Sequence, residues 1–138
     1  MEKLLGGAPP PERAAQALEV VRITVAILIL IHGIYRAAAG IVEPFGTWLS
    51  SLGFPYGYGW AAAVTVIEWI GPVLILLRRY VFWACLVHIS ILSLGLVLVH
   101  LPEGWFVVGA GRNGVEYSVF LIVSLAAIAW AYRPQMKA

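Results

Sequence analysis

Apolar residues are arranged along this chain in four long runs, separated by short polar or turn-rich segments. The runs are Val20–Ala39, Trp60–Leu77, Tyr80–Leu101 and Glu116–Tyr132. Each is close to or above the length with which a helix crosses a bilayer, about 17–25 residues, whereas a membrane strand needs only about 9–11. The pattern therefore predicts an all-α protein, an integral membrane four-helix bundle.

The segment between the first two runs contains a further predicted helix. Between Pro44 and Gly53, four apolar residues recur at i, i+3, i+4 and i+7: Phe45, Trp48, Leu49 and Leu52. That spacing places them on one side of a short amphipathic helix. We expect this helix to lie in the first outer loop, against the end of the bundle, and to cover part of any polar pocket there.

Composition narrows the class of protein further. The chain has 138 residues, of which 62% are hydrophobic and 12% are charged, so an ordinary soluble domain is excluded. The net charge of +2 is too small to suggest nucleic acid as a partner. Four spans leave no room for a soluble domain, so soluble chemistry has to come from a partner protein. The single cysteine, Cys85, excludes a self-contained dithiol site and is expected to be a small core residue.

The basic residues predict how the chain is oriented. If the N-terminus is inside, seven basic residues lie on the cytoplasmic side: Lys3, Arg13, Arg22, Arg78, Arg79, Arg133 and Lys137. Only Arg36 and Arg112 lie outside, and this bias predicts an N-in, C-in topology. The chain then divides into a cytoplasmic linker and interfacial helix start (1–19), the transmembrane domain (20–132) and a cytoplasmic tail (133–138).

Glu68 is the candidate functional residue that the pattern singles out. It interrupts the second apolar run, where a charged residue costs roughly 2.5–3.5 kcal/mol, and such residues commonly face protein, a wet cavity or a proton path. Counted at about 1.5 Å per residue from the ends of their runs, Glu68, His32 and His88 lie at similar depths. We predict that Glu68 and His32 form one protonatable, catalytic site. The alternative is that Glu68 is a buried structural acid, either neutral or paired with His32 or Arg36. His88 is either a further ligand-binding residue or a packed core residue.

A second group of ionisable residues gathers at the outer end of the predicted bundle. It consists of Arg36, Glu43, His100, Arg112 and Glu116. We expect Arg36 to hold either Glu116 or an anionic part of a ligand, with His100 and Arg112 as further ligand-binding residues. His100 and Glu116 are equally well explained as loop anchors. No metal site is predicted.

The order of several short motifs resembles that of the DoxX family of small four-helix membrane proteins. The motifs are Arg22, His32-Gly33 and Arg36, then Leu52-Gly53-Phe54-Pro55, Glu68 with Gly71, His100, Gly104-Trp105-Phe106 and Asn113-Gly114-Val115-Glu116-Tyr117. Pro72 and Val115 stand where the family commonly has glycine, which affects local packing. The resemblance implies a multi-pass protein of the bacterial or archaeal cytoplasmic membrane. It also implies a link to quinone-reducing membrane complexes.

Three functions are consistent with these features. The first is a quinone- or redox-linked membrane subunit, an oxidoreductase component, whose intramembrane pocket surrounds Glu68 and whose electrons come from other membrane or soluble subunits. The second is a non-catalytic subunit that binds membrane lipid or another lipophilic molecule, or that serves as a scaffold, with homo-oligomers left open. The third is a haem protein with His32 and His88 as axial ligands. No intrinsic cofactor is predicted; a quinone is the cofactor that the first function implies.

Overall fold

The computed structural model describes residues 8–109 and 112–135, and every regular element in these ranges is a helix. The helices are α1 (Pro11–Ala38), α2 (Val42–Ser51), α3 (Gly57–Leu76), α4 (Val81–Gly95) and α5 (Glu116–Ala131). A π-helical turn, η2 (Leu96–His100), and a 3-10 turn, η3 (Leu101–Glu103), continue α4. The predicted all-α class is confirmed for the described part of the chain.

Three of the helical segments are long and apolar enough to cross a membrane. They are Pro11–Ala38, Gly57–Leu76 and Val81–Glu103, which contain most of the first three predicted spans. The fourth predicted span forms α5, an apolar helix of 16 residues. At about 1.5 Å per residue, α5 is about 24 Å long, which is shorter than the hydrocarbon core of a typical bilayer. In length and composition three of these helices suit a membrane span, and α5 is shorter than those three.

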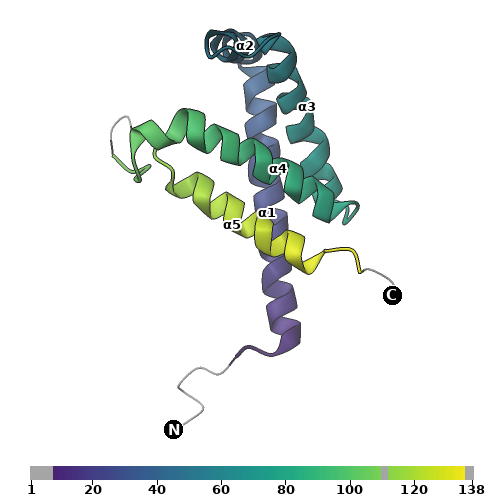
Figure 1. The fold of residues 1–138 in the computed structure, drawn as a ribbon. Coiled ribbons are helices and arrows are strands. Elements are labelled where there is room, and N and C mark those ends of the chain that lie inside the picture. The colour runs from purple at the N-terminus through teal and green to yellow at the C-terminus, as the bar shows by residue number, and fades with distance from the viewer. Residues whose placement is uncertain (1–7, 110–111, 136–138) are drawn as a thin grey trace.

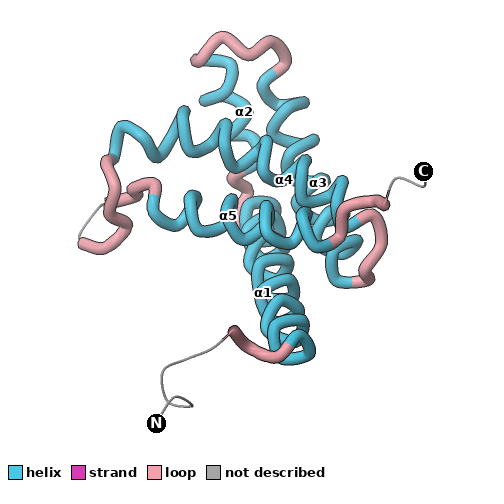
Figure 2. The backbone as a smooth tube through the Cα atoms, turned by 60° about the horizontal axis from the view of Figure 1, so that its bottom comes forward, coloured by secondary structure: helices cyan, strands magenta, loops and turns pink. Residues whose placement is uncertain are grey.

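The long helices are arranged as two antiparallel pairs that cross one another (Figure 1). In one pair α1 packs along α3, and in the other α4 and α5 form a hairpin that runs obliquely across α1. The short helix α2 lies over the end of the α1–α3 pair, and the first turns of α1 extend past the other helices (Figure 2). We call the two ends of this arrangement the α2 end and the opposite end.

The amphipathic pattern of the first loop correctly predicts α2, which begins at Val42 and ends at Ser51. Its contact with α3 is unusually close, because it runs through two glycines. A Cβ atom on Gly46 would lie 2.6 Å from the Tyr58 Cα, and one on Gly57 would lie 2.1 Å from the Gly46 carbonyl oxygen. Since side chains at these two positions would force the helices apart, α2 is held firmly on the start of α3.

A core of apolar side chains joins the two helix pairs. Ile75 of α3 and Leu125 and Ile128 of α5 are fully buried in it, beside Val25 and Ile29 of α1. Cys85 of α4 lies in the same core with no exposed surface, in agreement with its expected packing role. The face of α3 that carries small and polar residues is buried as well, so it faces protein, as predicted for Glu68.

Candidate functional site

Glu68 forms a two-pronged ion pair with Arg36 of α1. The Arg36 Nη1 lies 2.6 Å from the Glu68 Oε2 and the Nη2 lies 3.2 Å from the Oε1. Both side chains are nearly enclosed, with exposed fractions of 12% for Arg36 and 7% for Glu68. Such paired, charge-assisted hydrogen bonds are the geometry in which a buried carboxylate is well satisfied. The prediction that Arg36 holds Glu116 is therefore wrong, because Arg36 is bound to Glu68 instead.

The pair forms beside a close approach of α1 to α3. A Cβ atom on Gly33 would lie 2.8 Å from the Glu68 Cβ, so only glycine lets α1 pass this near to α3. Arg36, one turn further along α1, then reaches across to the carboxylate. The sequence left His32 and Arg36 as alternative partners of Glu68, and the structure selects Arg36.

The Arg36–Glu68 pair forms one wall of a cavity of about 420 Å³. We call this space the α2-end cavity. Its lining comes from every helix, and the remaining walls are almost entirely apolar. The residues that line it are His32, Arg36, Ile41, Phe45, Trp48, Leu49, Phe54, Trp60, Val64, Glu68, Ile91, Leu92, Leu94, Gly95, Leu98, Val99, His100, Asn113 and Ser118. An apolar space with a few polar groups on one side is the usual form of a small-molecule site.

The roof of the α2-end cavity is the apolar side of α2. Phe45, Trp48 and Leu49 face into it, as the spacing of the first loop predicts, whereas Leu52 is 46% exposed and lies outside. The Arg36 guanidinium lies 5.0 Å from the centre of the Phe45 ring, a cation–π contact that ties the roof to the ion pair. The polar wall and the apolar roof are therefore one connected structure.

Two of the predicted histidines also line the α2-end cavity. His32 lies one turn before Arg36 on α1 and borders the cavity that Glu68 borders, but its side chain is exposed and makes no hydrogen bond to Glu68, so their predicted common site stays a prediction. His100, at the end of η2, lines the same space, and its Nδ1 lies 2.8 Å from the Asn113 carbonyl oxygen. A π-helical turn widens the helix where it borders the cavity, a feature that is frequent at functional sites. His100 thus both holds the loop before α5 and faces the cavity.

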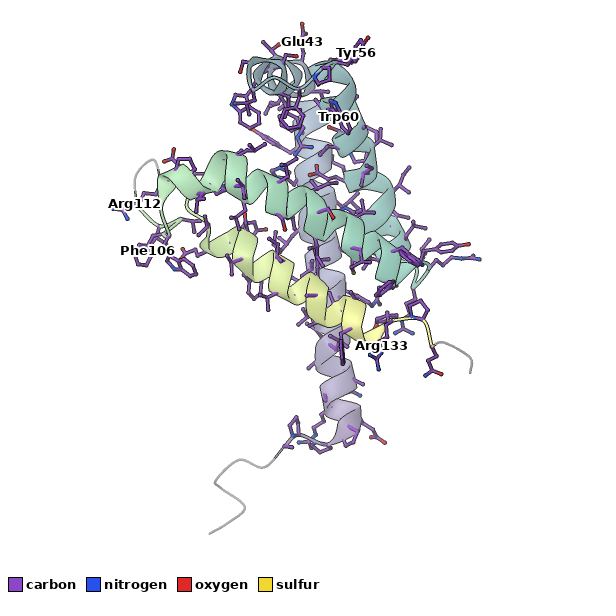
Figure 3. The ribbon with its side chains drawn as sticks, viewed as in Figure 1. Glu43, Tyr56, Trp60, Phe106, Arg112 and Arg133 are labelled. Atoms are coloured by element: carbon purple, nitrogen blue, oxygen red, sulfur yellow. The ribbon has the colours of Figure 1, made fainter. Side chains whose placement is uncertain are left out.

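Glu116 and Arg112 do not take part in this site. A Glu116 carboxylate oxygen accepts a hydrogen bond of 3.0 Å from the Val107 backbone N–H, so it anchors the loop that precedes α5. Arg112 is exposed in that loop, at the end of the α4–α5 hairpin where the two helices connect, and the adjoining Asn113 rather than Arg112 lines the cavity (Figure 3). Neither residue lines the α2-end cavity, so their predicted ligand-binding roles there are not supported by their positions.

His88 and His32, the predicted pair of haem ligands, border different cavities. His88 is 1% exposed, its Nδ1 lies 2.8 Å from the Ala84 carbonyl oxygen, and its ring presses on α3 at Gly71. A Cβ atom on Gly71 would lie 2.1 Å from the His88 Cε1. His88 borders a smaller cavity of about 270 Å³, whereas His32 borders the α2-end cavity. The two histidines therefore do not face a common space in which a haem would fit.

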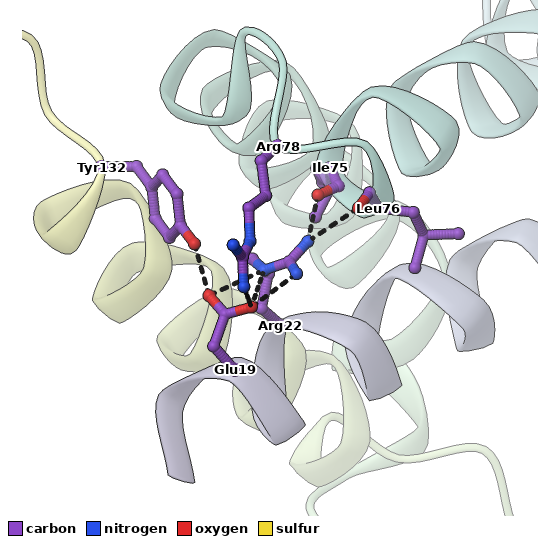
Figure 4. A network of polar contacts seen from close by, with 6 residues as sticks. All are labelled: Glu19, Arg22, Ile75, Leu76, Arg78 and Tyr132. Carbon is purple, nitrogen blue, oxygen red and sulfur yellow. Dashed lines mark hydrogen bonds and ion pairs between the residues drawn. The ribbon is translucent and has the colours of Figure 1, made fainter. Parts of the chain in front are cut away.

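At the opposite end, the structure contains an ion cluster that the sequence did not indicate (Figure 4). Glu19 of α1 receives hydrogen bonds from Arg22, Arg78 and the Tyr132 hydroxyl. Arg22, which is 2% exposed, also donates to the carbonyl oxygens of Ile75 and Leu76 at the end of α3. We call these residues the Glu19 cluster. Its only visible signal was the spacing of Glu19 and Arg22, which places them on one side of a helix.

The Glu19 cluster serves to fix helix ends rather than to bind a ligand. Backbone carbonyls at a helix end lack partners within the helix, and a basic side chain satisfies them and favours the negative end of the helix dipole. The hydrogen bond from Arg78 to Glu19 raises the pKa of Arg78 above its ordinary value, so this loop arginine stays charged. The cluster joins α1, the end of α3, the α3–α4 loop and the end of α5.

No family model, no curated protein and no solved structure matches this chain. The resemblance to the DoxX family accordingly stays a prediction that rests on the residues quoted for it.

Proposed function

We propose that this chain is a DoxX-like, multi-pass protein of a bacterial or archaeal cytoplasmic membrane, with four spans and both termini inside. The three long apolar helices and the apolar α5 support the spans. The uneven distribution of basic residues supports the orientation. In this orientation the α2 end faces outward and the Glu19 cluster lies at the inner surface.

Cysteine labelling in intact cells tests the orientation. In a Cys85→Ala background, Ser51→Cys should react with a membrane-impermeant maleimide, because α2 is outside. Lys137→Cys should react only after the cells are opened. Labelling of Lys137→Cys in intact cells would contradict the N-in, C-in topology.

The α2-end cavity is the proposed binding site for a lipophilic molecule with a small polar head group, and a quinone is the expected ligand. The observation that carries this proposal is an apolar cavity of about 420 Å³ with the Arg36–Glu68 pair on its wall. A quinone head group needs hydrogen-bond donors, which Arg36 and His32 supply, while the apolar walls suit its ring and tail. His32 and Glu68 are the groups placed to exchange protons with the bound head group.

The role would be that of a quinone-linked subunit of an oxidoreductase complex. The described residues contain no group of three metal-ligating side chains, and Cys85 is the only cysteine of the chain. Electron transfer would therefore depend on a partner subunit. This chain would contribute the quinone site, the polar wall and a roof that separates the head group from water.

Binding of a soluble quinone analogue to the purified protein tests the proposal. Saturable quenching of Trp48 and Trp60 by ubiquinone-1 or a menaquinone analogue is expected, since both rings line the cavity. Gly95→Leu should abolish saturation without unfolding the protein. A Cβ atom at Gly95 meets nothing within 4 Å, so the new side chain fills the cavity. Arg112→Gln is the matched control and should bind normally.

Quenching that rises linearly with quinone concentration in both Gly95→Leu and the unmodified protein would overturn the quinone proposal. Linear quenching reports partition of the quinone into detergent and not binding to the cavity.

A non-catalytic subunit is the second candidate, and one observation favours it. Arg36 and Glu68 already satisfy each other, which is the state of a structural ion pair. Glu68→Gln separates the two candidates, because it keeps the shape but removes the charge. A folded Glu68→Gln protein that binds quinone as tightly as the unmodified one, with full activity in its complex, would favour the lipophilic-ligand or scaffold role.

A further inference from the structure

A second, open groove lies between α4 and α5, away from the α2-end cavity. It has a volume of about 960 Å³, and apolar side chains of both helices form its sides. Phe82, Leu86 and Ile89 come from α4, and Ala126, Ala129 and Trp130 come from α5. The two alanines leave the space that bulkier residues would fill. The groove is therefore an apolar slot along the surface of the helix hairpin.

A positive charge closes one end of this slot. Arg133 lines the groove just after α5, and its guanidinium lies 4.5 Å from the centre of the Trp130 ring (Figure 3). Within the described residues, Arg133 makes no ion pair with a carboxylate. A guanidinium stacked on tryptophan is held in place and keeps its hydrogen-bond donors for another anion.

The surroundings of Arg133 add to this positive charge. Arg22, Arg78 and Arg79 lie at the same end of the helices, where Glu19 is the acidic group of the Glu19 cluster. Arg22 and Arg78 share that one carboxylate, whereas Arg79 and Arg133 have none within ion-pair distance in the described ranges. An anion at the groove end therefore meets a net positive field.

We propose that this groove holds one anionic phospholipid, with an acyl chain between α4 and α5 and the phosphate on Arg133. Charge and shape select this occupant: the slot is apolar, its end is basic, and a tryptophan lies at the junction, where it suits a membrane interface. The inference rests on the proposed membrane orientation, which puts Arg133 at the inner surface. It is independent of the ligand in the α2-end cavity.

Retention of lipid through purification tests this site. The protein is purified from vesicles that contain phosphatidylglycerol and phosphatidylcholine, and the bound lipids are counted by native mass spectrometry. Preferential retention of one phosphatidylglycerol is expected. Arg133→Gln should lower its retention by about fivefold, the effect of one basic residue at an anionic surface. Arg79→Gln, which removes an equal charge outside the groove, should lower retention clearly less than Arg133→Gln does.

A second pair of variants separates the slot from the charge. Ala126→Phe places a ring inside the groove and should displace the acyl chain, whereas Ala127→Phe lies outside the groove lining and should not. Equal losses in Arg133→Gln and Arg79→Gln would overturn the proposal, because they indicate non-specific attraction to the surface. Equal retention of phosphatidylcholine, or a dimer that Ala126→Phe dissociates, would also overturn it. A failed quinone assay leaves these outcomes unaffected.

Discussion

Two ion clusters at opposite ends of the molecule use the same residue types in different ways. At the α2 end, Arg36 and Glu68 pair with each other and border a cavity. At the opposite end, the buried Arg22 pairs with Glu19 and donates to two backbone carbonyls of α3. The first cluster borders a cavity, whereas in the second the buried arginine is bound by groups of the protein itself.

This difference shows how a buried charge can be assigned a role from its surroundings. Burial alone does not separate the two arginines, because both are largely enclosed. What separates them is the nature of the partners and of the adjoining space. Arg22 completes the end of a helix, so its role is structural. Arg36 holds a carboxylate at a cavity wall, so its position suits ligand binding as well as stability.

Removing Arg22 should have the largest effect on stability. Arg22→Met leaves the Leu76 carbonyl without its side-chain donor and takes a charged partner from Glu19. Because these groups are largely buried, we expect a loss of about 3 kcal/mol in the free energy of unfolding. Thermal unfolding in detergent measures it, and quinone binding at low temperature should be unchanged. An Arg22→Met protein as stable as the unmodified one would contradict the structural role assigned to Arg22.

Breaking the Arg36–Glu68 pair should lower the free energy of unfolding by less than the loss of Arg22 does. A second substitution should restore most of that stability. Glu68→Leu strands the Arg36 charge beside the cavity, so we expect a loss of about 2 kcal/mol. The double variant Glu68→Leu, Arg36→Met removes both charges and should recover most of that stability, as apolar replacement of buried pairs often does. Denaturant unfolding of the three proteins checks this. A double variant less stable than Glu68→Leu would argue against simple pairing.

Two glycines allow a comparison between a filled and an open space. Gly71→Ala forces its Cβ against the His88 ring at 2.1 Å, and overpacking of this kind costs about 1–3 kcal/mol. Gly95→Ala meets no atom within 4 Å and should stabilise α4 by about 0.5–1 kcal/mol through helix propensity. Melting temperatures in detergent should therefore shift in opposite directions. Equal shifts would mean that the α2-end cavity is closed in solution.

The smallest effect is expected at the exposed side of the Glu19 cluster. The Arg78 side chain is 62% exposed, so its ion pair with Glu19 is screened by water. Arg78→Gln should change the free energy of unfolding only slightly, and high salt should reduce even that difference. Unfolding at low and high salt provides the measurement. A loss of stability as large as that of Arg22→Met would show that the exposure of an ion pair does not determine its contribution to stability here.

The sequence predicted the helices well, because long apolar runs and the repeat of Phe45, Trp48 and Leu49 are local signals. It also predicted that Glu68 faces protein. It failed where contacts depend on how helices cross. Depth counted along separate spans cannot show that Gly33 brings α1 against α3, so the choice among His32, Glu116 and a ligand as partners of the Glu68 and Arg36 charges stayed open. Arg22 was predicted only as a basic residue of the cytoplasmic side, because its carbonyl partners carry no sequence signal.

The unequal lengths of the two helices in the α4–α5 hairpin affect the surrounding lipid. The segment Val81–Glu103 has 23 residues and spans about 34 Å, whereas α5 has 16 residues and spans about 24 Å. A hydrocarbon layer of about 30 Å is too thin for the first and too thick for the second. In the proposed four-span topology, tilting would accommodate the longer segment, whereas α5 would be matched by local thinning of the bilayer. Acyl-chain length would then act on this protein chiefly through α5.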